Sequence, residues 1–165
     1  MDFQTPKGKK EMPCNCNQKI QVKYKKLVPE AFTPYRATDH AAGFDLTAIQ
    51  SEWMNGKVTY RTGLAFEIPP GYYGQFCPRS SIRDKFLMLS NGVGVIDADY
   101  RGEVTATFRL LEGCRGFLET TDQIYQPGER IGQLIILPLP EVDLMEAHEL
   151  TPTKRGEGGH GSTGR

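Results

Sequence analysis

Short apolar runs alternate along this sequence with turns that are rich in glycine and proline. The 18 glycines and 11 prolines are spread over the chain rather than gathered in one segment. Short strands joined by such turns are typical of all-β domains, so we expect an all-β fold. The predicted strands cover residues 21–27, 42–48, 58–68 (one strand or two), 72–77, 91–97, 103–110, 130–138 and 141–150.

Length and charge exclude several classes of protein. The 165 residues suit one domain with a core, and are too few to argue for two. Because 20 Lys and Arg balance 20 Asp and Glu, no global positive field favours nucleic acid. No apolar run is long enough to span a bilayer, and no signal-peptide pattern is present. We therefore expect a soluble protein with a small ligand, and neither nucleic acid nor a membrane as partner.

The cysteines at positions 14, 16, 77 and 114 have no disulfide or zinc-site spacing as a set. We interpret Cys14 and Cys16 as reduced thiols in a flexible arm, although the pair could be half of a metal site. Reduced thiols favour the cytoplasm, which would be the host cytoplasm for a viral protein.

Residues 91–107 combine a strand pattern, a turn and a carboxylate that looks buried. Val95 and Asp97 fall on one face of a period-two element, so Asp97 ends an otherwise apolar strand. Gly92 and Gly94 weaken a strand, and the usual reason is close approach of a ligand or another backbone. We interpret the stretch as a hairpin at the floor of an active site. An ordinary hairpin with a solvent-facing Asp97 is the alternative.

Two further segments predict sites for an anion. Residues 78–86 place a proline, Arg79 and two serines before a helix-compatible run, a pattern typical of a helix N-terminus that binds phosphate. An ordinary helix cap with a solvated arginine is the alternative. Residues 155–165 combine glycines, hydroxyls and arginine as a phosphate cradle does, although a disordered end would have the same composition.

These segments divide the chain into three parts. We expect a flexible N-terminal arm over residues 1–19, a β-barrel domain over 20–150 and a glycine-rich tail over 151–165. The irregular segment 111–126 is predicted to be a long surface loop.

Five segments resemble, in order, the five motifs of the trimeric-type dUTP diphosphatases. They are residues 42–46, 78–81, 91–103, 128–134 and 155–164. The resemblance covers the chain from about residue 41 to its end. It implies an all-β, jelly-roll-like distorted β-barrel with one short helix. It also implies a homotrimer with sites at the subunit interfaces, and a C-terminal tail that closes over the site.

The reaction implied by this resemblance is hydrolysis of dUTP to dUMP and diphosphate, which keeps uracil out of DNA and supplies dUMP for thymidylate synthesis. Asp97 would activate the water that attacks the α-phosphate, and Gln133 would hold this water from the side. Mg²⁺ is the implied cofactor, held by triphosphate oxygens and waters. Asp45 would act on it indirectly, with a purely structural role as the alternative. Arg130 is expected to form a structural ion pair.

The resemblance also assigns residues to parts of the nucleotide. The backbone of Gly94, Val95 and Ile96 would pair with the uracil edge. Asn91 would fix the ring, and Tyr100 would exclude a 2′-hydroxyl. The residues implied for the phosphates are Arg79, Ser80, Ser81, Arg155, Gly161, Ser162 and Thr163.

The chain departs from the family pattern at three places. His160 stands where the family usually has a Phe in the closing tail, so we expect weaker or pH-dependent closure. The connection from Arg109 to Pro127 looks longer than the usual turn. The N-terminal arm lies outside the resemblance.

Two other functions compete with dUTP hydrolysis. A dCTP deaminase-like enzyme of the same fold would carry a Glu as proton shuttle about where Thr107 stands, and threonine cannot abstract a proton at neutral pH. The other alternative is a dUTP-dependent regulatory binding protein, whose partner would contact the 111–126 loop or the N-terminal arm.

Overall fold

The computed structural model describes residues 19–111 and 123–159 of the chain. Strands make up nearly all of the regular structure in these residues, so the predicted all-β class is confirmed. The elements are β1 (Lys23–Lys26), β2 (Phe44–Thr47), β3 (Gln50–Met54), β4 (Lys57–Arg61), β5 (Leu64–Glu67), β6 (Tyr72–Pro78), the 3-10 helix η1 (Ser80–Asp84), β7 (Leu87–Leu89), β8 (Gly94–Ile96), β9 (Thr105–Leu110) and β10 (Arg130–Pro138).

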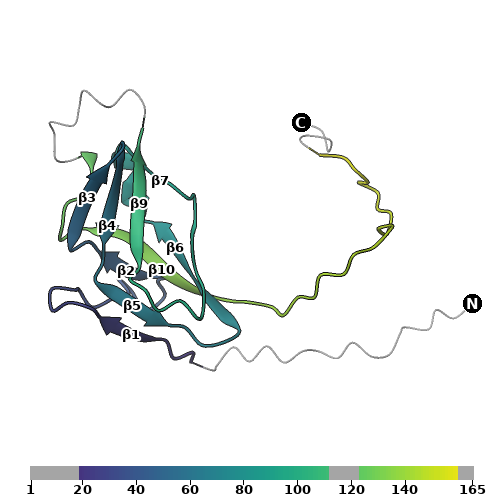
Figure 1. Cartoon of the computed structure of the whole chain (residues 1–165), viewed down its shortest axis with the longest axis horizontal. Coiled ribbons are helices and arrows are strands. Elements are labelled where there is room, and N and C mark those ends of the chain that lie inside the picture. Colours follow the sequence, from purple (N-terminus) through teal and green to yellow (C-terminus); the bar gives the residue numbers. More distant parts are fainter. Residues whose placement is uncertain (1–18, 112–122, 160–165) are drawn as a thin grey trace, which may run out of the picture.

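The strands form two antiparallel four-stranded sheets and a two-stranded ribbon (Figure 1). One sheet, which we call the β10 sheet, has the order β2-β10-β6-β8. The other, the β9 sheet, has the order β3-β4-β9-β7, and β1 pairs with β5 in the ribbon. The core lies between the inner faces of these layers, as in a β-sandwich or jelly roll.

Period-two alternation explains which faces are buried. In β9, Ala106, Phe108 and Leu110 are buried while Thr105 and Arg109 are exposed. Burial of each large apolar side chain stabilises the fold by roughly 1.5–3 kcal/mol. The same alternation in β4 buries Val58 and Tyr60, and Ile131 and Leu134 of β10 are also buried in the core.

Seven of the eight predicted strand segments contain strands of the structure. Residues 21–27, 42–48, 58–68, 72–77, 91–97, 103–110 and 130–138 contain β1, β2, β4 with β5, β6, β8, β9 and β10, respectively. The strands β3 and β7 were not predicted. The burial pattern of β3 is almost entirely exposed, so its sequence carries no apolar face to reveal it.

The predicted hairpin over residues 91–107 is wrong. Strand β8 pairs with β6 in the β10 sheet, whereas β9 pairs with β4 and β7 in the β9 sheet. The connection over residues 97–104 is longer than the two-residue loop of a tight hairpin, and it carries the chain from one sheet to the other. We call this connection the inter-sheet corner.

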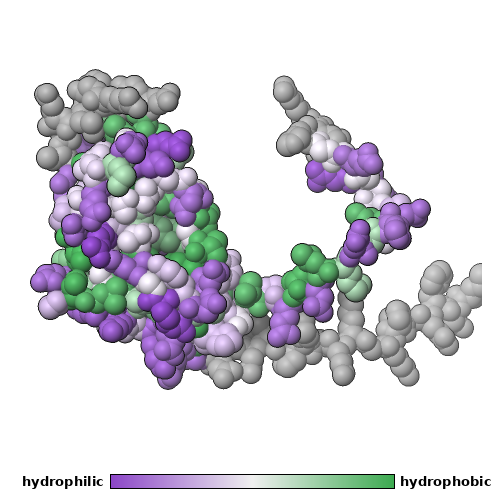
Figure 2. Space-filling model, viewed as in Figure 1, coloured by the Kyte–Doolittle hydropathy of each residue, from purple (hydrophilic) through white to green (hydrophobic). Residues whose placement is uncertain are grey.

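The predicted strand over residues 141–150 is also wrong. This stretch has no regular structure, and it belongs to a C-terminal segment that leaves the sheets after β10 (Figure 1). Figure 2 shows apolar residues along the segment, and Leu144 and Met145 are 95% and 87% exposed. A strand needs a hydrogen-bonded neighbour. Within the described residues, no strand of the same subunit pairs with this stretch.

The predicted helix near residue 80 is the 3-10 helix η1. Arg79 is its N-cap residue and makes no side-chain capping hydrogen bond. A 3-10 turn of this length has little dipole, so a phosphate at this point needs side chains rather than the helix end. No helix in the described part of the chain is long and apolar enough to cross a membrane.

Candidate active site

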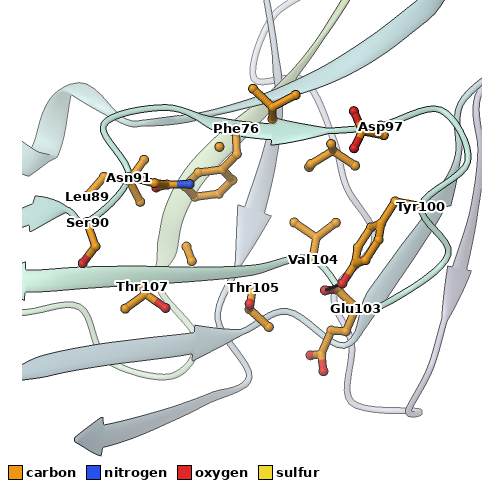
Figure 3. A pocket seen from close by; sticks show the side chains of 14 residues that line it. Phe76, Leu89, Ser90, Asn91, Asp97, Tyr100, Glu103, Val104, Thr105 and Thr107 are labelled. Atoms are coloured by element: carbon orange, nitrogen blue, oxygen red, sulfur yellow. Dashed lines mark hydrogen bonds between the residues drawn. The ribbon is translucent and has the colours of Figure 1, made fainter. Parts of the chain in front are cut away.

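A cavity of about 450 Å³ opens beside the inter-sheet corner (Figure 3). We call it the β8–β9 cavity, because β8 and the start of β9 form two of its walls. Phe76 of β6 and the residues after β7 complete it. The described residues predicted to bind the nucleoside all line this cavity, together with Asp97: Asn91, Gly94, Val95, Ile96 and Tyr100.

The backbone of β8 faces this cavity because its first residue has no side chain. A Cβ at Gly94 would lie 3.0 Å from Cβ of Phe76 and 3.8 Å from Nδ2 of Asn91. The close approach predicted for this glycine is therefore to a neighbouring strand of the same subunit. It places the Asn91 amide beside the β8 backbone, where amide and main-chain groups together can pair with a flat polar ring.

Asp97 follows the last residue of β8 directly (Figure 3). The side chain is exposed within the subunit, so the expectation of a buried carboxylate is wrong. The reason is its position at the start of the corner, after the strand has left the core. The Asp97 carbonyl accepts a hydrogen bond of 3.1 Å from the Tyr100 N–H, which fixes the turn behind it.

Tyr100 is held in place by the chain that follows it. Its hydroxyl donates to the carbonyl oxygen of Glu103 at 3.1 Å. Its ring lies over Gly102 so closely that any Cβ there would collide with the ring and the hydroxyl. Gly102 therefore allows the aromatic side chain to lie along the cavity wall.

Glu103 anchors the far end of the corner. Its Oε2 accepts hydrogen bonds from Nη2 and Nε of Arg61 at 2.6 and 2.9 Å, and its Oε1 accepts one from the Gly63 N–H at 2.7 Å. Burial acts to raise the pKa of Glu103, but the hydrogen bonds from Arg61 and Gly63 outweigh it, so the pKa lies below its usual value.

Thr107 also lines the β8–β9 cavity, where the deaminase alternative would need a glutamate. Its hydroxyl lies 2.9 Å from the Thr59 hydroxyl. Neither hydroxyl is a base at neutral pH, so this position cannot move a proton as a carboxylate would.

A second cavity of about 270 Å³ lies beside η1, and we call it the Arg79 cavity. Its lining carries three cations, one carboxylate and two hydroxyls: Arg79, Lys85, Arg130, Glu129, Ser81 and Tyr125. Ser80, the neighbour of Ser81, is exposed. Cationic and hydroxyl groups around one concave site are the chemistry that binds phosphate.

Asp45 joins two of these cations. Its Oδ1 accepts from Nε of Arg79 at 3.1 Å, and its Oδ2 accepts from Nη1 of Arg130 at 2.9 Å. Burial acts to lower the pKa of Arg130, but the hydrogen bonds with Asp45 and Tyr35 raise it overall. The predicted structural ion pair of Arg130 is confirmed. With Asp45 only 8% exposed, the geometry also supports the structural role for this carboxylate.

Gln133 and Asp97 do not meet within one subunit. Gln133 of β10 pairs with Cys77 of β6, whereas Ile96, the residue before Asp97, pairs with Gly74. With β6 between them, β10 and β8 are about 10 Å apart across the sheet. Asp97 lies one residue beyond Ile96, so it is also offset from Gln133 by about 13 Å along the strands. A water on Asp97 is thus beyond hydrogen-bond reach of Gln133 in the same chain.

Comparison with known proteins identifies the family of the chain that carries these two cavities. The family model described as dUTPase matches residues 30–164. The chain belongs to the dUTPase family.

Several relatives cover nearly the whole chain. The deoxyuridine 5'-triphosphate nucleotidohydrolase of Hydrogenobaculum sp. (strain Y04AAS1) is 39% identical over 144 residues, which span 85% of this chain and 95% of the relative. The protein of the same description from Paramecium bursaria Chlorella virus 1 is 38% identical over the same shares. The solved structure of Staphylococcus bacteriophage 80alpha dUTPase with dUPNHPP is 25% identical, with a TM-score of 0.75 over 88% of this chain and 99% of the other.

The last motif of the dUTPase family is only partly described. Arg155 is exposed, and its Nε donates to the Gly158 carbonyl at 2.7 Å in a local turn of the C-terminal segment. The other tail residues of the predicted site lie outside the described residues: His160, Gly161, Ser162 and Thr163. Arg155 lines neither of the two cavities in its own subunit.

Sequence reasoning missed Glu103, Lys85 and Tyr125. Glu103 fell at the start of the predicted strand over residues 103–110, and only the pairing with Arg61 reveals its role. Tyr125 fell in the predicted surface loop 111–126, yet it is 2% exposed. Its aromatic character was the available signal, because a large ring is costly to leave in water. Of that loop, residues 112–122 lie outside the described residues.

Proposed function

We propose that this member of the dUTPase family hydrolyses dUTP to dUMP and diphosphate by attack of an Asp97-activated water on the α-phosphorus. The observation that supports it best is the convergence of Asn91, Gly94, Asp97 and Tyr100 on one cavity. This cavity offers main-chain and amide groups for a base, an aromatic wall for a sugar and a carboxylate for a water.

Base selection follows from the fixed groups of β8. The main chain of Val95 and Ile96 and the amide of Asn91 would pair with the uracil edge. Cytosine presents a donor where uracil presents an acceptor, so it would leave buried groups unpaired, at a cost of about 10⁴ in specificity. Tyr100, fixed over Gly102, would lie where a ribose 2′-hydroxyl would be.

The inner phosphates would lie in the Arg79 cavity, on Arg79, Ser80 and Ser81. Arg155 and the tail would close over the outer phosphate. Both oxygens of Asp45 are already bonded to arginines, so this carboxylate suits an indirect role toward a cation. A Mg²⁺ ion would be held by the triphosphate and by waters, with no direct protein ligand, and would offset the charge of the phosphates.

The water would donate a proton to Asp97 as its oxygen attacks the α-phosphorus. The bond from that phosphorus to the bridging oxygen of the β-phosphate breaks, and diphosphate leaves. Gln133 would hold the same water from the side.

This assignment needs more than one subunit, so we infer a homotrimer with shared sites. Asp97 and Gln133 lie too far apart in one chain, and neighbouring subunits can bring them together. The C-terminal segment exposes Leu144, Met145 and Leu150, which a neighbouring subunit would cover. The proposed nucleotide substrate keeps the cytoplasm as the expected compartment.

The test is to incubate the full chain with Mg²⁺ and either dUTP, dCTP or UTP, and to assay diphosphate and ammonia separately. Diphosphate from dUTP alone is the expected result. Ammonia from dCTP would support the deaminase alternative instead. Diphosphate from UTP at a comparable rate would contradict the role of Tyr100.

A further inference from the structure

Tyr125 stands directly behind the predicted phosphate ligand Ser81. Its ring is buried and packs edge-on against Tyr60 and at a tilt against Phe108, with centroids 6.1 and 5.9 Å away. The Tyr60 hydroxyl also donates to the Tyr125 carbonyl at 2.8 Å. The phenol is therefore fixed from behind, while its hydroxyl reaches the Arg79 cavity.

At that end the Tyr125 hydroxyl lies 3.2 Å from Oγ of Ser81. A phenol is a stronger hydrogen-bond donor than an aliphatic alcohol, because it is more acidic. The favoured arrangement has the Tyr125 O–H donating to Ser81. The serine proton is then free to turn toward the cavity, and a chain of two hydroxyls polarises in the same direction.

The charges around this pair favour an anion as the acceptor. Lys85 lies with Nζ 5.2 Å from the centre of the Tyr125 ring, and it forms an ion pair of 3.7 Å with Glu129. Arg79 and Arg130 share the single carboxylate of Asp45, which leaves a net positive charge beside Ser81. Burial raises the pKa of Tyr125 above its usual value despite the opposing effects of Ser81 and Arg79, so the phenol keeps its proton at neutral pH.

We propose that Tyr125 is a positioning residue for phosphate binding, whose hydroxyl orients Ser81 so that the serine donates to an inner phosphate of the substrate. The inference rests on the proposed function, because it takes Ser81 as a phosphate ligand. Tyr125 itself touches no substrate in this scheme. It acts through the direction of one hydrogen bond.

The test compares Tyr125→Phe, Ser81→Ala and the double variant in the full chain. Dissociation constants are measured for two ligands. One is dUpNHpp, an analogue of dUTP that carries the phosphates, and the other is deoxyuridine, which carries none and is measured by NMR titration. Tyr125→Phe keeps the ring and should weaken the binding of dUpNHpp about threefold to tenfold, the range for one lost hydrogen bond. The dissociation constant of deoxyuridine should not change. The double variant should bind dUpNHpp no more weakly than Ser81→Ala alone.

Tyr73→Phe is the matched control. Its hydroxyl lies 3.5 Å from Oε1 of Gln75, and Tyr73 lines neither cavity. This variant should bind both ligands as the unaltered chain does.

If Tyr125→Phe weakens the binding of dUpNHpp and of deoxyuridine equally, the residue has a merely structural role and the inference is overturned. Unchanged dUpNHpp binding, or additive losses in the double variant, would do the same. Should Tyr125→Phe fail to fold, the test is NMR of the unaltered chain labelled with ¹³Cζ-tyrosine. The chemical shift of the Tyr125 signal should change when dUpNHpp is added and should not change when deoxyuridine is added. Any other pattern refutes the inference. Diphosphate release by the unaltered chain, assayed in parallel, tests the proposed function separately. A chain that neither binds dUpNHpp nor releases diphosphate refutes both.

Discussion

Replacing Asp45 with asparagine tests whether the carboxylate shared by Arg79 and Arg130 organises the phosphate side of the site. Asparagine keeps one acceptor oxygen but presents an N–H₂ group to the other guanidinium. One charge-assisted hydrogen bond is then lost, in a place where Asp45 is 8% exposed.

A hydrogen bond to a charged group contributes about 1.5–3 kcal/mol. We take the lower part of that range, about 2 kcal/mol, because the Arg130 side chain is 37% exposed and water can replace part of the lost bond. For a chain of this length the loss corresponds to a fall in Tm of about 4–8 °C. Arg79 also loses the anchor of its Nε, so the KM for dUTP should rise about threefold to tenfold, the cost of ordering one free side chain.

The assay is thermal unfolding at fixed subunit concentration, together with steady-state hydrolysis of dUTP. Asp84→Asn is the matched control, because Asp84 pairs with Arg83 at 3.3 Å while both side chains are mostly exposed. This control should lower Tm by less than about 2 °C and leave KM unchanged. If Asp45→Asn resembles Asp84→Asn in both measurements, the carboxylate does not organise the arginines, and the reasoning fails.

Four further outcomes are expected. Asp97→Asn should bind dUpNHpp as the unaltered chain does, yet lose about 10²–10⁴ in kcat; retained turnover would show that another group activates the water. Gly102→Val should displace Tyr100, raise the KM for dUTP and weaken the preference for dUTP over UTP, and an unchanged preference would remove Tyr100 from sugar selection. Folding lowers the pKa of Glu103, so its stabilisation is complete above the ordinary glutamate pKa of about 4.3 and is lost as the pH falls through the lower folded value. Glu103→Gln should therefore flatten the acid limb of Tm against pH, and an identical limb would exclude this residue as a cause. Removal of residues 155–165 should leave a folded trimer in light scattering with little activity, whereas a monomer would contradict the shared sites.

The sequence predicts which face of a strand is buried better than it predicts which strand lies beside it. Alternation in residues 103–110 shows correctly that Phe108 and Leu110 point inward, because solvent exposure repeats with the pleat. The same pattern does not say which strand lies alongside. The pairing of β8 with β6 joins residues 94–96 to residues 74–76, and no local signal records this contact. The hairpin was predicted wrongly for this reason.

The site shows the same division. The family resemblance assigned Gly94 and Tyr100 to the nucleotide, and both line the β8–β9 cavity, while their roles stay predictions. The exposure of Asp97 and the burial of Tyr125 could not be assigned, because each depends on how distant segments pack. The role of His160 stays a prediction, as this residue lies outside the described part of the chain.

The inter-sheet corner links the spacing of the two sheets to the proposed catalytic site. Asp97 follows a strand of one sheet, and Glu103 is bonded to the other sheet through Arg61. The Tyr100 backbone is bonded to Asp97 and its hydroxyl to Glu103, so the position of this ring between the two ends of the corner depends on the spacing of roughly 10 Å between packed sheets. Substitutions deep in the apolar interior, far from any nucleotide, can change this spacing, and their damage would then be measured as slower turnover before it is measured as unfolding.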